Sequence, residues 1–169
     1  MMKPALLVID VQKEFFLINH ATAQSLHSAI EYINSAIELF REKQLPVISI
    51  QHVDKEDNLV PGEEGFDLPE ELKILPEDLH IHKTYSNSFN KTSLAEELKK
   101  LDVDTLIITG FCAEYCVLST FRGAKDLDFT PIMLRGALAS GEKENIRFVE
   151  SISDVLSFGA LKSMLANMK

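Results

Sequence analysis

Cysteine, tryptophan and long apolar runs are scarce or absent in this chain of 169 residues. It has two cysteines and no tryptophan, so a framework of several disulfide bonds is excluded. No apolar run approaches the roughly 20 residues that a membrane-spanning helix needs. The first 16 residues also lack the layout of a signal peptide, because their short apolar run carries Asp10. We therefore expect a cytoplasmic protein with reduced thiols.

Basic residues are outnumbered by acidic ones. The chain has 17 lysines and arginines against 26 aspartates and glutamates, which gives a formal net charge of -9. This excess repels nucleic-acid phosphates and anionic lipid headgroups, so we expect neither nucleic acid nor membrane as a partner. Repeats and linkers are absent, and the length suits one core. We expect a single domain over residues 1–169.

Short apolar runs, typical of strands buried on both faces, recur along the chain. They alternate with segments of helical spacing and are joined by short connections, which predicts a mainly parallel sheet covered by helices on both sides. The expected fold is therefore α/β, with three layers and a central sheet of six strands. The runs are residues 5–9, 46–52, 79–83, 105–109 and 130–134, with a shorter sixth near Val155.

Helical segments are expected between these runs. Apolar residues recur three and four positions apart from Leu26 to Phe40, which places them on one helix face. Ser93 and Glu96 have the spacing of a capping box, which predicts a helix that begins there and continues to Lys100. Further helices are expected to begin near residues 114, 142 and 160.

Polar residues that follow the apolar runs are the first candidates for a site, because ligands of such sheets bind at the carboxyl ends of the strands. Asp10, His52 and Lys83 end or follow three runs, and Cys116 lies just beyond a fourth. A cysteine attacks a carbonyl as its thiolate. A helix amino terminus and Lys83 would lower the pKa of the Cys116 thiol, and Asp10 would act as a general base.

Each of these residues also has an ordinary structural interpretation. Asp10 alone would serve as a helix or turn cap, Lys83 as a solvated strand end, and Cys116 as a small buried residue. The two thiols four positions apart also leave a redox pair open, although C-x-x-x-C differs from the C-x-x-C of disulfide oxidoreductases. The set of three is harder to dismiss, because all would lie on one edge of one sheet.

The chain resembles the isochorismatase-like cysteine hydrolase superfamily, which includes nicotinamidases and N-carbamoylsarcosine amidases, from Ala5 to about Leu165. Three motifs carry the resemblance, in the order and between the strands that the family has. They are Asp10-Val-Gln12-Lys-Glu-Phe15, Lys83-Thr-Tyr-Ser-Asn-Ser-Phe89 and Gly110-Phe-Cys-Ala-Glu-Tyr-Cys116-Val117.

The resemblance implies a catalytic triad of Asp10, Lys83 and Cys116. It also implies a cis peptide bond between Phe111 and Cys112, and an oxyanion hole made by the backbone amides of Cys112 and Cys116. Cys112 would then matter through its backbone, with a side chain that packs. Relatives form dimers or tetramers, so a homodimer or homotetramer is expected.

Three departures from the family pattern stand out. Ala113 replaces a common threonine, and Gly136 lies in a stretch where many relatives have an aspartate. The third departure concerns the metal of nicotinamidases, which an Asp-x-His pair and a further histidine bind. Here His52 and Asp54 occur in the reverse order, and we expect no metal and no other cofactor.

Other histidines and aromatics have less specific roles. His80 and His82 alternate along one strand, so they either chelate an ion or form half-exposed strand surface. The substrate pocket is expected to be lined by four residues, whose alternative role is core packing. These are Phe16, His52, Phe89 and Tyr115.

The leading functional hypothesis is a cysteine-dependent hydrolase of the C–N bond in a small amide, carbamoyl or ureido compound, acting through a thioester. An isochorismatase-type vinyl-ether hydrolase, which does not need the cysteine, is the alternative enzyme. A ligand-binding module and a thiol redox sensor on the same scaffold are the alternatives without catalysis. The sequence does not identify the substrate.

Overall fold

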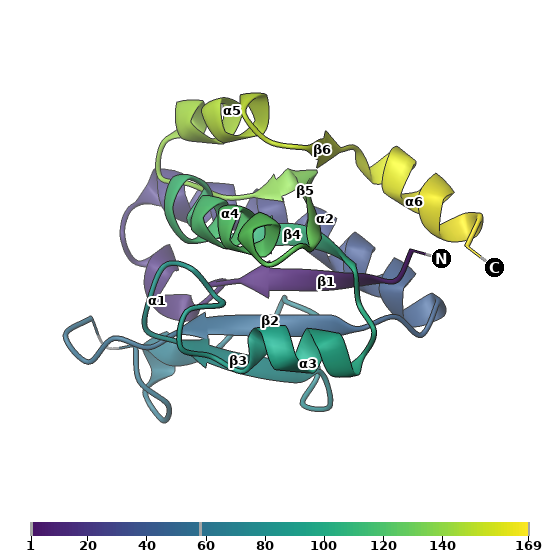
Figure 1. Cartoon of the computed structure of the whole chain (residues 1–169). Coiled ribbons are helices and arrows are strands. Elements are labelled where there is room, and N and C mark those ends of the chain that lie inside the picture. The colour runs from purple at the N-terminus through teal and green to yellow at the C-terminus, as the bar shows by residue number, and fades with distance from the viewer. Residues whose placement is uncertain (1, 58, 169) are drawn as a thin grey trace.

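A single six-stranded sheet forms the centre of the computed structural model, which describes residues 2–57 and 59–168. All neighbouring strands run parallel in the order β3-β2-β1-β4-β5-β6, which confirms the expected α/β sheet (Figure 1). The strands are β1 (Pro4–Ile9), β2 (Val47–His52), β3 (Leu79–Lys83), β4 (Thr105–Gly110), β5 (Thr130–Leu138) and β6 (Val155–Leu156).

Helices cover both faces of the sheet. In Figure 1, α2 lies behind the sheet and α3 and α4 lie in front of it. The apolar residues of α2 and α6 join one core cluster, and those of α3, α4 and α5 join the other. Within the described residues, no helix is both long and apolar enough to cross a membrane. The helices are α2 (His20–Glu42), α3 (Leu94–Lys100), α4 (Leu118–Asp126), α5 (Lys143–Ser151) and α6 (Phe158–Ala166).

The central strand β1 shows why the sequence folds in this way. Its side chains alternate between the two faces of the sheet, since the strand repeat is two residues. Leu7 and Ile9 enter one core cluster, while Leu6 and Val8 enter the other. All four are essentially inaccessible to solvent, and each such side chain contributes roughly 1.5–3 kcal/mol by burial. A continuous apolar run is therefore required here.

Some details differ from the sequence expectations. A short helix, α1 (Lys13–Phe16), and two single turns, η1 (Glu64–Phe66) and η2 (Ala113–Val117), lie in segments expected to be loop or α-helix. The capping box was wrong: the Ser93 side chain caps nothing. Ser93 has φ -83° and ψ 2°, not the extended backbone of a capping residue, and Thr92 Oγ1 accepts the hydrogen bond from the Leu94 amide instead.

The site begins where the strand order reverses. β1 pairs with β2 on one side and with β4 on the other, so the chain leaves the carboxyl ends of β1 and β4 side by side. Gly110 ends β4 with φ +119°, and Asp10 follows β1 with φ 53°. A side chain at Gly110 would place its Cβ 2.0 Å from the Ile9 carbonyl oxygen. Only glycine allows this approach.

We predict that Gly110→Ala lowers the free energy of unfolding by about 3 kcal/mol or more, because both the contact and the positive φ oppose a side chain. Gly159→Ala is the matched control: its Cβ meets nothing within 4 Å, and its helical position predicts a gain of about 0.5–1 kcal/mol. Urea unfolding of both variants measures the difference. Equal stability of the two would contradict the predicted close contact.

Candidate active site

Three of the sequence-predicted residues meet at the carboxyl edge of the sheet. Asp10 follows β1, Lys83 ends β3, and Cys116 lies in the π-helical turn η2 after β4. Lys83 Nζ is 2.8 Å from Asp10 Oδ2 and donates to Cys116 Sγ at 3.3 Å. The side chains of Lys83 and Asp10 are 0% and 2% exposed. Neighbouring strands lie about 4.8 Å apart, so only a long side chain reaches across β2 from β3 to β1.

Lys83 has a third partner in His52. The lysine Nζ lies 3.1 Å from the Nδ1 atom of the His52 ring. An ammonium group carries three N–H donors, and Lys83 therefore has one acceptor for each: Asp10, His52 and Cys116. The carboxylate of Asp10 keeps one oxygen, Oδ1, buried and without a hydrogen-bond partner in the described part of the chain.

Burial dominates the electrostatics of the cluster. It raises the pKa of Asp10 above its usual value, against the opposing charge of Lys83. Burial, and then the charge of Asp10, also raise the pKa of the Cys116 thiol to about 12. The sequence expectation of a lowered thiol pKa was therefore wrong. Lys83 does lower this pKa, but its charge is shared with a carboxylate.

The turn that carries Cys116 leads directly into α4, so the thiol lies at the amino-terminal end of a helix. The peptide bond between Phe111 and Cys112 is cis, at the position that the family resemblance implies. Within the described chain, neither the Cys112 amide nor the Cys116 amide donates a backbone hydrogen bond to an acceptor outside η2. These two amides therefore stay the candidate oxyanion-hole donors that the family resemblance implies.

Glu114 holds this turn in place, a role that the sequence analysis missed. Its Oε1 atom accepts hydrogen bonds from Ser140 Oγ at 2.9 Å and from Asn145 Nδ2 at 2.7 Å. Burial alone raises the pKa of Glu114, but hydrogen bonds from Cys112, Ser140 and Asn145 lower it overall. A lone acidic residue in a turn gives no sequence signal for such distant partners.

The Cys112 side chain sits beside this carboxylate. It is half-buried and packs against the core cluster of α2 and α6, as the family resemblance implies. Burial, and then the hydrogen bond to Glu114, raise the pKa of its thiol to about 12. Both cysteines are free thiols in the structure.

Gln12 fixes the end of β2 against the end of β1. This fully buried side chain donates from Nε2 to the His52 carbonyl oxygen at 3.0 Å and accepts from the His52 amide at 2.7 Å. The motif containing Gln12 was visible in the sequence, but its partner, 40 residues away, was not. The pair of hydrogen bonds sets the backbone position from which the imidazole reaches Lys83.

The four expected pocket residues are placed differently from one another. His52 contacts the cluster directly. Phe89 stacks on Phe129 at 5.7 Å and packs against the same core cluster as Cys116. The Phe16 ring packs on His27 at 5.0 Å and lines a cavity that none of the three cluster residues lines.

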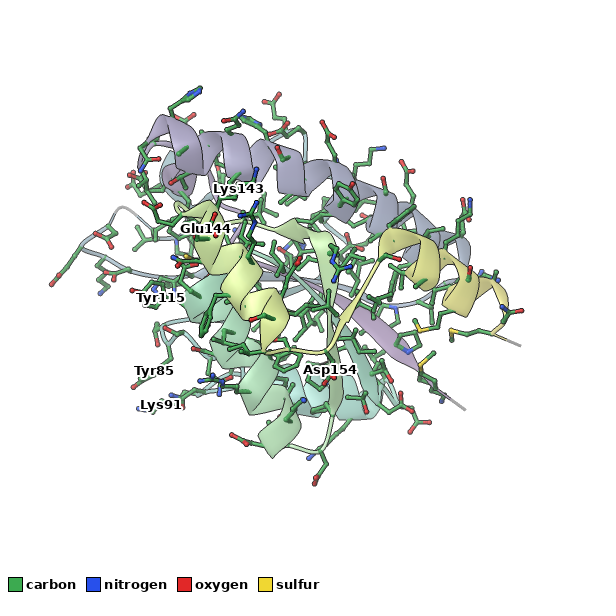
Figure 2. All side chains as sticks on the ribbon, turned by 90° about the horizontal axis from the view of Figure 1, so that it is seen from above. Tyr85, Lys91, Tyr115, Lys143, Glu144 and Asp154 are labelled. Atoms are coloured by element: carbon green, nitrogen blue, oxygen red, sulfur yellow. The ribbon has the colours of Figure 1, made fainter. Side chains whose placement is uncertain are left out.

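Tyr115 is 66% exposed and lies at the outer side of the molecule (Figure 2). It can reach a ligand only at the rim of the site. Tyr115 and Cys116 are consecutive residues of a helical turn, so their side chains point in different directions, and Tyr115 is exposed while Cys116 is partly buried. The contacts of Phe16 and Tyr115 thus give their expected role little support.

The residues near the metal position of nicotinamidases are engaged in other contacts. His52 Nδ1 is occupied by Lys83, and Asp54 Oδ1 accepts from the Glu56 amide. His80 hydrogen-bonds the Leu75 carbonyl oxygen and His82 packs on Phe66. Over residues 2–57 and 59–168, no three side chains of the ligand types His, Cys, Asp and Glu form a metal-sized group.

We predict that Asp10→Asn speeds alkylation of Cys116 by iodoacetamide at pH 8. The charge of Asp10 is one cause of the raised thiol pKa, and its removal leaves Lys83 to stabilise the thiolate alone. Each unit of pKa changes the thiolate fraction about tenfold, so a gain of about tenfold or more is expected. Fragment-ion mass spectrometry of the peptide 101–122 measures the rate at each cysteine.

Cys112→Ala is the control for this measurement, since it leaves Cys116 as the single thiol. In the Cys112→Ala variant with Asp10 unchanged, the rate of Cys116 alkylation should still rise with pH above 9. A plateau below pH 9, or slower alkylation after Asp10→Asn, would contradict the charge balance described here.

Comparison with known proteins places this chain in a family. The Isochorismatase domain model matches residues 4–151. An uncharacterized isochorismatase family protein of Bacillus subtilis, YrdC, is 38% identical over 140 residues, which cover 82% of this chain and 74% of that protein.

Solved structures agree on the fold. An isochorismatase-like hydrolase from Alkaliphilus metalliredigens superposes with a TM-score of 0.86 at 23% identity, covering 96% of this chain and 98% of that one. N-carbamoylsarcosine amidase from Thermoplasma acidophilum superposes with a TM-score of 0.79 at 24% identity, covering 93% and 97%. Because the family model matches most of this chain, the chain belongs to the isochorismatase family of hydrolases.

Proposed function

We propose that this protein is a cysteine-dependent hydrolase that cleaves the C–N bond of a small amide, carbamoyl or ureido compound. The observation that carries the proposal is the buried contact of Lys83 with both Asp10 and Cys116. It joins a nucleophile, a general base and a cation in one cluster. These are the parts that acyl transfer through a thioester requires.

In the first half of the reaction, Asp10 accepts the proton of the Cys116 thiol as the sulfur attacks the substrate carbonyl carbon. The raised pKa of Asp10 makes it a stronger base than an exposed aspartate. Lys83 stays an ammonium throughout. It stabilises the Asp10 carboxylate before the transfer and the Cys116 thiolate as the thiolate forms. The cluster keeps one negative and one positive charge before and after the transfer.

The tetrahedral intermediate places its oxyanion on the amides of Cys112 and Cys116. Asp10 then returns its proton to the leaving nitrogen, the C–N bond breaks, and the acyl group remains on Cys116 as a thioester. In the second half, Asp10 takes a proton from water, which attacks the thioester, and the proton returns to the departing sulfur. Each oxyanion-hole donor contributes about 3 kcal/mol to such a step.

Two further observations support an amide substrate over isochorismate. The first is the pairing of Lys83 with Asp10. Isochorismate carries two carboxylates, and this cation is already neutralised by a carboxylate of the protein. The thiol itself is the second, since vinyl-ether cleavage does not need it. Among the similar structures, N-carbamoylsarcosine amidase has a name that indicates a substrate with a carbamoyl group.

We predict that Cys116→Ala abolishes hydrolysis in a panel of small amides, carbamates and ureides, with a loss of about 10⁴-fold or more for the best substrate. Ammonia or amine release measures turnover. Cys112→Ala is the matched control: only its backbone amide takes part, so its activity should stay within about tenfold of wild type. Circular dichroism checks that both variants fold.

Two results would count against the proposed function. Full activity of Cys116→Ala on the best amide would remove the sulfur from the mechanism. Activity of that variant toward isochorismate, with none toward amides, would favour the vinyl-ether reaction instead.

A further inference from the structure

The imidazole of His52 is the part of the cluster that the proposed chemistry leaves without a role. It is half-buried at the end of β2 and held from two directions. Its backbone is hydrogen-bonded to Gln12, and its ring Nδ1 lies 3.1 Å from the Lys83 ammonium. A residue that only lined a pocket would not need both its backbone and its ring to be held by hydrogen bonds.

Lys83 determines which ring nitrogen carries the proton. Because the ammonium is paired with buried Asp10, it donates to its other neighbours and has no lone pair to accept with. Nδ1 of His52 must therefore be unprotonated. In a neutral imidazole the proton then sits on Nε2.

The Nε2–H group is left free to bind something else. In the described residues it has no hydrogen-bond partner, yet it is not among the buried side-chain atoms that lack one. It is thus reachable from solvent. Lys83 contacts both the ring Nδ1 and the Cys116 sulfur, so the imidazole is separated by a single ammonium group from the sulfur that substrate would approach.

We propose that His52, fixed by Lys83 as the Nε2–H tautomer, donates a hydrogen bond to an acceptor atom of the substrate and so selects for substrates with an oxygen or nitrogen acceptor near the scissile carbonyl. The tautomer follows from the geometry alone. The contact with substrate rests on the proposed amide hydrolysis.

The surrounding charges are consistent with a neutral ring. Burial, and then the charge of Lys83, lower the pKa of His52, while Asp10, Asp54 and Asp57 act in the opposite direction. Protonation at low pH would place an N–H on Nδ1 facing the ammonium and break the contact. The imidazole should therefore stay neutral to a lower pH than a free histidine.

Nitrogen-15 NMR of the whole protein tests the tautomer without any substrate. Two-bond ¹H–¹⁵N spectra distinguish the two ring nitrogens, and His52→Asn identifies the His52 signals among the five histidines. We expect the Nε2–H form at pH 7 and a titration midpoint below 6.5. An Nδ1–H form, or a charged ring at pH 7, would overturn the proposal.

Kinetics with the best amide of the panel test the donor. His52→Asn places an oxygen near the Nδ1 position for Lys83 but has no atom at Nε2, so KM should rise about tenfold while kcat stays within about threefold. His52→Gln extends an amide N–H toward the Nε2 position and should recover part of the loss in KM. An unchanged KM in His52→Asn would disprove the donor.

The two experiments separate the proposals. A panel in which no amide is hydrolysed would count against the proposed function, and the NMR spectra would still decide whether Lys83 fixes the tautomer. Nε2–H with an unchanged KM would leave the amidase standing and refute the selection by His52.

Discussion

A buried ammonium with three acceptors organises this site. Removing a charge from water costs several kcal/mol unless it is paired and fully hydrogen-bonded. Lys83 meets that condition through three residues from three segments: Asp10, His52 and Cys116. Displacing any one of these acceptors would leave an N–H group of Lys83 unsatisfied in the interior. The cluster therefore holds the ends of β1, β2 and β3 and the η2 turn in fixed positions relative to one another.

Further contacts around the Lys83 cluster hold its residues in place. Gln12 ties the segment after β1 to the backbone of His52, and Glu114 ties the turn that carries Cys116 to Ser140 and Asn145. Gly110 lets β1 and β4 approach closely enough for their following loops to meet. Reacting groups must be held to within a fraction of an ångström, and here that precision comes from hydrogen bonds between distant segments.

The sequence predicted the parallel sheet well, because continuous apolar runs such as that of β1 are typical of strands buried on both faces. It did not predict the order of the strands, in which β4 lies beside β1 and not beside β3. It also predicted which residues meet, since Asp10, Lys83 and Cys116 all follow strands of one sheet. It could not predict that the pKa of the Cys116 thiol is raised, because this depends on how deeply the thiol is buried and on the nearby charge of Asp10. Nor could it predict the partners of Glu114, which depend on packing between separate segments.

The balanced charge of the Lys83 cluster also bears on how substrate arrives. In the proposed mechanism, proton transfer between Asp10 and Cys116 leaves the summed charge of the cluster at zero, so the cluster itself projects little long-range field. An uncharged substrate would reach it by unassisted diffusion, and turnover of such a compound should respond weakly to ionic strength. Discrimination would then rest on short-range fit at the sulfur and imidazole, the two groups of the cluster that remain partly accessible.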